Sequence, residues 1–139
     1  MLRFTDQPTS LALVVYSSRV PAGFPSPADD YVEGHLDLNE HLVRRPAATF
    51  FARATGESMK DVGIFDGDLL VIDRSITPQA DDVVIAVVHG ELMVKRLKGR
   101  DGSWKLAAEN PAYAAIPVDD AGCEVWGVVT HNIRNHCNR

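Results

Sequence analysis

The stretch DVVIAVVHGELMVKRL, residues 82–97, decides the fold class of this chain. It contains two apolar runs joined by little more than His89 and Gly90, which is typical of a tight β-hairpin. Similar short runs flank it, separated by Gly, Pro, Asp and Asn residues: ATFFARA (48–54), DLLVID (68–73), SWKLAAE (103–109) and EVWGVVTHNI (124–133). No helical pattern long enough for a parallel crossover lies between these runs. The sequence therefore predicts a mainly β, compact domain of antiparallel strands.

The N-terminal part of the chain has a different character. After a short apolar piece at residues 11–16, the segment SSRVPAGFPSPADD (17–30) contains three prolines. Prolines at this density favour an extended, exposed chain. We therefore expect a flexible N-terminal arm over residues 1–30, followed by a β-rich domain over residues 31–139.

One short helix is predicted near the start of this domain. In LDLNEHLVRR (36–45), Asp37 is placed to accept backbone amides as an N-cap, and Glu40 follows three residues later, as in a capping box. Pro46 helps to end the helix, because the residue before a proline avoids helical backbone angles.

Composition limits the possible classes of function. With 139 residues, of which 45% are hydrophobic, the chain is long enough for one domain with a real core. A formal net charge of -5 argues against a surface devoted to nucleic acid. No signal peptide and no apolar run of about 18 residues is visible, so a soluble cytoplasmic protein is expected.

Metal binding is not expected from the sequence. Its cysteines are Cys123 and Cys137, and together with His131 and His136 they form neither a Cys-x-x-Cys nor a His-x3-His pair. The sequence therefore predicts no metal site and no cofactor, and it leaves the role of the two cysteines open.

Ser58, in the segment ATGESMKDVGIFDGDLLVID (54–73), raises the question of a catalytic serine. A serine in such a setting is usually a turn residue or a helix cap. Lys60 occupies the position that a hydrolase elbow, G-x-S-x-G, gives to glycine, and no histidine lies in a recognisable triad setting. A serine can instead be activated by a lysine whose pKa has been lowered by burial.

Lys95 is the candidate for such a lysine. In ELMVKRL (91–97), strand alternation places Met93, Lys95 and Leu97 on one face. Arg96, on the other face, cannot act as a base because a guanidinium group stays protonated. Judged from the strand alone, it is more common for such a lysine to pack its aliphatic stem against the protein and extend its ammonium group into solvent than to be buried as a base.

Three motifs occur in the order found in one peptidase family. GESM (56–59), DGDLLVID (66–73) and VKRL (94–97) together resemble the Ser-Lys self-cleaving peptidase family of LexA, UmuD and phage repressors, as does the interval between the serine and the lysine. The segments AGFPSPADDYVE (22–33) and DLNEHLVRRPAATFF (37–51) are similar to the UmuD branch. The resemblance covers nearly the whole chain from residue 20 onward and implies a largely β peptidase domain.

The resemblance implies a role for individual residues. Ser58 would be the nucleophile, Lys95 the general base and Ala22-Gly23 the scissile bond. The alanine departs from the cysteine that is familiar before this bond in UmuD, and it agrees with repressors of the LexA type. The backbone amides of Gly56, Glu57 and Ser58 are candidates for holding the oxyanion.

The same resemblance implies partners. In the UmuD branch, a RecA filament on single-stranded DNA stimulates self-cleavage. The shortened form then works as a homodimer, the accessory subunit of a UmuC-type translesion DNA polymerase in SOS mutagenesis after DNA damage. Neither membrane association nor sequence-specific DNA binding is expected. Cleavage within one chain and cleavage between two chains both remain open.

Three other interpretations use the same residues. A self-cleaving repressor-type domain would carry a helix-turn-helix ahead of the cleavage site, and only about twenty residues precede AGFP here. A leader peptidase also uses serine and lysine, but it needs a membrane anchor. A non-catalytic β interaction module would contain Ser58 and Lys95 without using them, and a mass measurement after incubation would separate it from a peptidase.

Overall fold

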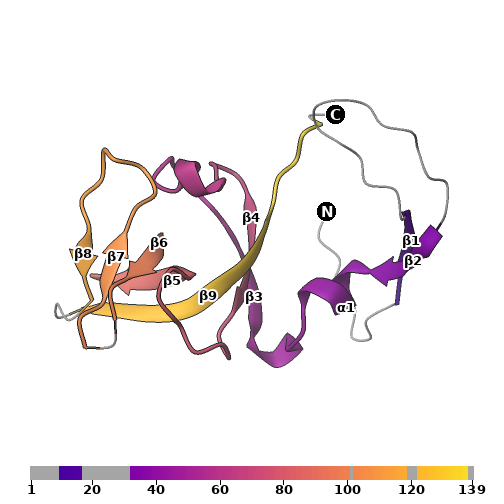
Figure 1. The fold of residues 1–139 in the computed structure, drawn as a ribbon, viewed down its shortest axis with the longest axis horizontal. Coiled ribbons are helices and arrows are strands. Elements are labelled where there is room, and N and C mark those ends of the chain that lie inside the picture. Colours follow the sequence, from indigo (N-terminus) through magenta and orange to yellow (C-terminus); the bar gives the residue numbers. More distant parts are fainter. Residues whose placement is uncertain (1–9, 17–31, 101, 119–121, 138–139) are drawn as a thin grey trace. The chain divides into compact units, whose positions relative to one another are not determined.

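A computed structural model describes residues 10–16, 32–100, 102–118 and 122–137 (Figure 1). The chain divides into two compact units, Met1–Arg44 and Arg45–Arg139, which we take in turn. The arm-domain boundary expected from the sequence, between residues 30 and 31, lies outside the described residues. No helix within the described ranges has the length and apolar character needed to cross a membrane.

The first unit contains a two-stranded antiparallel sheet. Strand β1 (Ala12–Tyr16) pairs with β2 (Val32–Asp37), and Ala12 lies opposite Asp37. From the sequence, residues 12–16 belong to the expected arm, and no strand is predicted there. The partner strand lies on the far side of a proline-rich segment, and a local pattern carries no signal of such a pairing.

Helix α1 (Leu38–Leu42) follows β2 directly and begins as predicted. Asp37 is its N-cap, and the carboxylate of Asp37 accepts the N–H of Asn39 at 3.0 Å. The helix is shorter than the expected range of residues 36–45, and none of its residues is buried. A helix that buries no apolar face gains little from tertiary packing, so a short helix is the expected result.

The second unit contains one seven-stranded sheet. Its strands are β3 (Thr49–Arg53), β4 (Leu69–Asp73), β5 (Val83–Val88), β6 (Glu91–Lys98), β7 (Lys105–Ala107), β8 (Ile116–Pro117) and β9 (Cys123–Ile133). They lie in the order β3-β4-β9-β5-β6-β7-β8, and every neighbouring pair is antiparallel. The predicted antiparallel β class is therefore confirmed.

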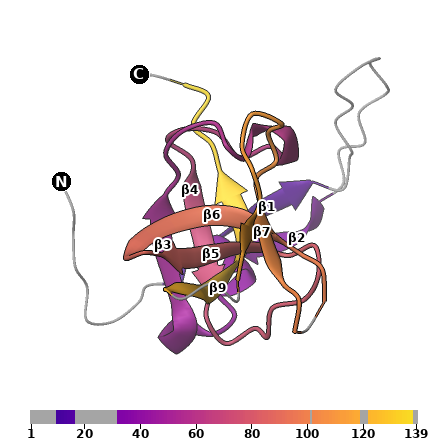
Figure 2. The same cartoon turned by 90° about the vertical axis from the view of Figure 1, so that its left-hand side faces the viewer.

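Strand β9 holds the sheet together near its middle, where it pairs with β4 on one side and β5 on the other (Figure 1). Both ladders contain an irregularity, at Val71/Ile72 and at Ile85/Ala86, and such bulges bend and twist a sheet. In Figure 2, β5 and β6 run across the view while β4 stands upright, in agreement with a strong bend. Gly127 permits β9 to approach β4 closely, because a Cβ at this position would lie only 2.7 Å from Ile72 Cγ2.

The β5-β6 hairpin forms at the predicted position. His89 has φ 49° and Gly90 has φ 82°, so both turn residues adopt left-handed backbone angles. Two such residues in succession match the twist of the flanking strands. Val88 consequently pairs with Glu91, and the register carries Lys95 opposite Val84.

Two apolar clusters form the core of the second unit. The first consists of Ala54, Met59, Ile64, Leu70, Ile72 and Ile85. The second consists of Val84, Ala86, Val88, Leu97, Leu106 and Val128. Ile85 belongs to one cluster while its neighbours on β5 belong to the other, because successive side chains of a strand point to opposite faces. Met59 and Leu97 tie the segments around Ser58 and Lys95 to these two clusters.

Candidate active site

Ser58 lies in the turn that leads from β3 into a short 3-10 helix, Lys60–Val62. Its side chain is half-buried, and the next residue, Met59, is buried in the core. Gly56 has φ 86°, a left-handed backbone conformation that suits glycine. The loop is therefore anchored on both sides of the serine.

The backbone amides of this loop differ in their hydrogen bonding. The N–H of Gly56 donates to Asp66 Oδ1 at 2.8 Å, so this amide already has an acceptor. Within the described part of the chain, the amides of Glu57 and Ser58 have no acceptor. Of the three oxyanion candidates, these two are the ones with a hydrogen available for a ligand.

Lys95 is buried in β6, with only 6% of its surface exposed. Burial lowers the pKa of its ammonium group below the ordinary value, because the charged form loses water. Among the described residues no carboxylate pairs with Lys95 Nζ, whereas Arg96 pairs with Glu109 and Lys98 pairs with Asp81. In this part of the chain, nothing offsets the effect of burial on the charged form of Lys95.

One cleft brings the predicted nucleophile and base together. It has a volume of about 430 Å³, and its walls include Gly56, Ser58, Met93, Lys95 and Tyr113. Nζ of Lys95 lies 5.4 Å from the centroid of the Tyr113 ring. The predicted scissile bond, Ala22-Gly23, lies outside the described residues.

The loop that follows β7 contributes to the site, although no motif in the sequence predicts a role for it. Its Glu109 carbonyl accepts the N–H of Asp61 at 2.9 Å, and its Glu109 carboxylate pairs with Arg96. The same loop carries Tyr113 into the cleft. Asn110-Pro111 is a recognisable turn signal, but nothing in the sequence indicates which strand the turn lies against.

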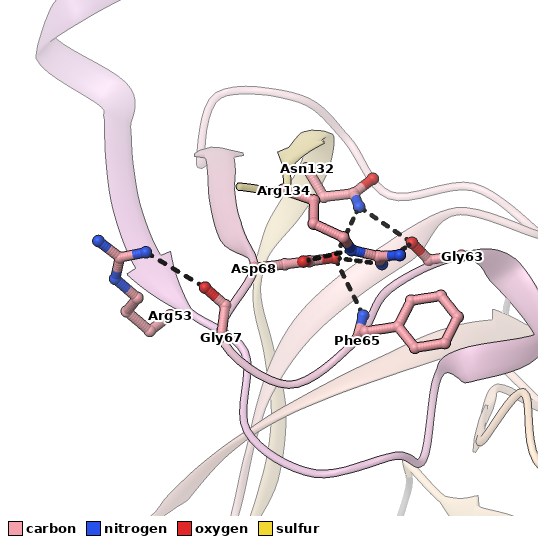
Figure 3. Close-up of polar contacts among 7 residues, drawn as sticks. All are labelled: Arg53, Gly63, Phe65, Gly67, Asp68, Asn132 and Arg134. Atoms are coloured by element: carbon pink, nitrogen blue, oxygen red, sulfur yellow. Dashed lines mark hydrogen bonds and ion pairs between the residues drawn. The ribbon is translucent and has the colours of Figure 1, made fainter. Parts of the chain in front are cut away.

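The DGD turn (66–68) between the serine and β4 is held by an ion pair between the buried carboxylate of Asp68 and the half-buried Arg134 (Figure 3). Asp68 is 1% exposed and accepts hydrogen bonds from Arg134 Nε at 2.9 Å, Asn132 Nδ2 at 3.0 Å and the N–H of Phe65 at 3.0 Å. The Arg134 guanidinium holds the pKa of this carboxyl well below its usual range.

Asn132 and Arg134 also reach the segment that follows Ser58. Both side chains donate to the carbonyl of Gly63, at 3.1 Å and 3.0 Å (Figure 3). The Arg134 guanidinium in addition stacks 3.8 Å from the centroid of the Phe65 ring. The end of β9 thereby fixes the loop between the candidate nucleophile and the DGD turn.

Comparison with known proteins decides the family. Residues 14–130 match the sequence model of the family described as peptidase S24-like. The chain belongs to this family. This peptidase S24-like chain is 46% identical to protein SamA of Salmonella typhimurium, over 90% of this chain and 87% of that protein. It is 48% identical to protein ImpA of Escherichia coli over 86% of this chain and 81% of that protein.

These relatives confirm the resemblance found in the sequence, because SamA and ImpA are UmuD homologues. The peptidase S24-like chain is also 38% identical to the LexA repressor of Photorhabdus laumondii, over 84% of this chain but 59% of that repressor. Sequence identity and coverage of the related protein are thus both higher for SamA and ImpA than for this LexA repressor.

The cleft has the groups needed for acyl transfer. A serine hydroxyl becomes a nucleophile when an adjacent neutral amine accepts its proton, and burial favours the neutral amine of Lys95. Backbone amides without acceptors can hold a developing oxyanion. The residues that the structure describes contain no group of three His, Cys, Asp or Glu side chains arranged for a metal ion.

Proposed function

We propose that this peptidase S24-like protein cleaves its own chain between Ala22 and Gly23 with Ser58 and Lys95 as a catalytic dyad. The observation that carries the proposal is the shared cleft, in which a desolvated lysine, with no carboxylate partner among the described residues, lies with a half-buried serine on an anchored loop. Family membership supports the peptidase character.

The reaction is acyl transfer to water. Ser58 Oγ bonds to the carbonyl carbon of Ala22 while its proton passes to Lys95 Nζ, and the amides of Glu57 and Ser58 hold the oxyanion. The bond between Ala22 and Gly23 breaks as Lys95 returns that proton to the departing amine. A water molecule then attacks the serine ester, again with Lys95 as base, and the Ser58 hydroxyl is restored.

Cleavage at this bond would alter the first unit as well as shorten the chain. Strand β1 lies before the scissile bond and β2 lies after it, so the cut separates two paired strands. The product, residues 23–139, retains the whole seven-stranded sheet.

The cellular role we propose is that of the UmuD branch, on the support of the UmuD homologues SamA and ImpA. A RecA filament on single-stranded DNA stimulates the cut in the cytoplasm during the SOS response. The shortened form is a homodimer that serves as accessory subunit of a UmuC-type translesion DNA polymerase. A filament can accelerate the cut only by binding the cleavable conformation more tightly than the other conformations.

A second candidate function is that of a repressor-type self-cleaving domain, which the similarity to the LexA repressor favours. It shares the cleavage chemistry and differs in its partner. Tight, sequence-selective binding of duplex DNA by the purified protein would support this role, whereas the net charge of -5 agrees with weak DNA binding.

An intact-mass time course tests the proposed function. Full-length protein is incubated alone at neutral pH, alone at alkaline pH, and at neutral pH with RecA, ATP and single-stranded DNA. We expect two fragments that correspond to a cut after Ala22, formed faster under the last two conditions. A cut at another bond, or none in any condition, would reject the assigned site.

A further inference from the structure

Asn110 connects the loop after β7 to the loop that carries Ser58. Its side-chain Nδ2 donates to the carbonyl of Glu57 at 3.0 Å, and its Oδ1 accepts the N–H of Ala112 at 3.1 Å. Only the nitrogen of an amide donates and only the oxygen accepts, so the two partners fix the orientation of this side chain. Asn110 is 9% exposed, so few water molecules compete for either bond.

The bond to Glu57 acts on the neighbouring amide of Ser58. The carbonyl of Glu57 and the N–H of Ser58 belong to one peptide group, and in a trans peptide they point in opposite directions. The described residues contain no cis peptide bond. The Glu57 carbonyl also accepts the N–H of Lys60 at 3.3 Å, and the bond from Asn110 is the shorter of the two. Holding the carbonyl toward Asn110 turns the Ser58 N–H away from Asn110. This N–H is one of the two loop amides without an acceptor in the described part of the chain.

A different part of Asn110 supports the other side of the cleft. The backbone carbonyl of Asn110 accepts the N–H of Tyr113 at 3.1 Å, and Tyr113 covers Lys95. This second bond uses the main chain alone and persists when the side chain is replaced. Substitution at this position can therefore disturb the Ser58 peptide while the turn that carries Tyr113 keeps its backbone bond.

We propose that Asn110 is a positioning residue for the self-cleavage reaction. It holds the Glu57-Ser58 peptide in the orientation that offers the Ser58 N–H to the oxyanion, and it acts through that peptide without touching the substrate. The inference rests on the proposed function. Loss of one oxyanion donor slows comparable enzymes about 100- to 1000-fold, and a displaced donor loses part of that effect.

The test compares two asparagines whose Oδ1 accepts the N–H two residues later, and of which Asn110 also donates to the Glu57 carbonyl. In Asn110→Ser the serine hydroxyl oxygen can still accept the Ala112 N–H, but the side chain is too short to donate to the Glu57 carbonyl. Asn135→Ser is the control, because exposed Asn135 makes the matching contact, Oδ1 to the N–H of Cys137 two residues later, at 2.9 Å, and does not line the cleft. Full-length variants, wild type and Ser58→Ala are incubated over a range of alkaline pH. The plateau rate and the pH midpoint of cleavage are measured for each.

For Asn110→Ser we expect a plateau rate about tenfold or more below wild type with an unchanged pH midpoint, since a weakened oxyanion donor slows the step without changing the Lys95 pKa. For Asn135→Ser we expect a plateau within about twofold of wild type. An unchanged plateau in Asn110→Ser would overturn the inference, as would a midpoint that moves together with the rate.

Folding is checked by circular dichroism before the rates are compared. If Asn110→Ser does not fold, Asn110→Asp replaces it, because aspartate has the shape of asparagine and lacks the donor. That variant introduces a charge and is judged by its plateau rate alone, with the same threshold. A wild type that is not cut under any condition would instead overturn the proposed function, and the inference with it.

Discussion

The ring of Tyr113 lies over the ammonium group of Lys95, with Nζ 5.4 Å from the ring centroid. The lysine is nearly inaccessible, whereas half of the surface of Tyr113 remains exposed, so the tyrosine forms the solvent side of the lysine pocket. The ring attracts the charged amine and also keeps water from it, and these effects shift the pKa of Lys95 in opposite directions. Burial is the dominant effect, because the pKa of Lys95 is lowered.

Replacing Tyr113 tests this balance. In Tyr113→Ala water reaches Lys95, its pKa rises toward the ordinary value, and cleavage slows severalfold at neutral pH but recovers at alkaline pH. Tyr113→Phe keeps both the ring and the coverage and should show a pH profile close to wild type. The profile is measured by gel densitometry of full-length protein. A downward shift of the midpoint in Tyr113→Ala would mean that the cation-ring attraction outweighs desolvation.

The role of Lys95 as a base is tested by Lys95→Arg. A guanidinium group has a pKa above about 12 and cannot supply a neutral amine, so the variant should not cleave itself. In wild type the rate should rise with pH until the amine is mostly neutral, because the lowered pKa of Lys95 brings deprotonation closer to neutrality. Circular dichroism establishes folding, since a buried guanidinium is costly. Cleavage by a folded Lys95→Arg protein would show that Lys95 is not the base that activates Ser58.

Ser58→Ala should remain folded and uncut. The substitution removes one hydroxyl from a half-buried turn residue, so we expect a change in unfolding free energy of less than about 1 kcal/mol. Intact mass reports the cleavage, and thermal unfolding reports the stability. A fragment pattern equal to that of wild type would show that another residue is the nucleophile.

The Asp68 carboxylate should make stability depend on pH in the acid range. Its folded-state pKa lies below the unfolded value of about 3.9, so its contribution is complete above that pH and is lost as the pH falls further. Asp68→Asn should cost about 2 kcal/mol at neutral pH, since the hydrogen bonds to a charged carboxylate are weakened. Denaturant unfolding at pH 7 and pH 3 measures both effects.

Asp61→Asn is the control for this prediction, because Asp61 is an exposed acid of the same segment. Its unfolding free energy should stay within about 0.5 kcal/mol of wild type. If Asp68→Asn and wild type lost the same stability between pH 7 and pH 3, the acid sensitivity would have to come from other carboxylates.

Much of the sheet could be predicted from the sequence. The strands around His89 and Gly90 alternate strongly and meet at a turn that needs left-handed residues, so both their limits and their pairing follow from local rules. The pairing of β1 with β2 could not be derived in this way. Its partners are separated by residues whose composition favours an extended chain, and pairing at such a separation depends on tertiary contacts.

The site was predictable in part. Ser58 and Lys95 follow from two motifs with a recognisable order, and the structure places both residues in one cleft. The contribution of the loop after β7 was not predictable. Asn110 and Tyr113 act through contacts with segments distant in sequence, and a turn signal fixes local geometry without indicating what the turn touches.

The position of β9 in the sheet has a consequence for the order in which the protein is made. A ribosome releases Ser58 and Lys95 well before residues 123–133, yet β4 and β5 have no ladder between them until β9 is inserted. Asn132 and Arg134, which fix the carbonyl of Gly63, belong to the last residues of β9 and the position directly after it. Long-range pairings of this kind form late in folding. A nascent chain therefore carries the proposed nucleophile, base and target bond without a finished cleft, so under this proposal synthesis can end before the first cut.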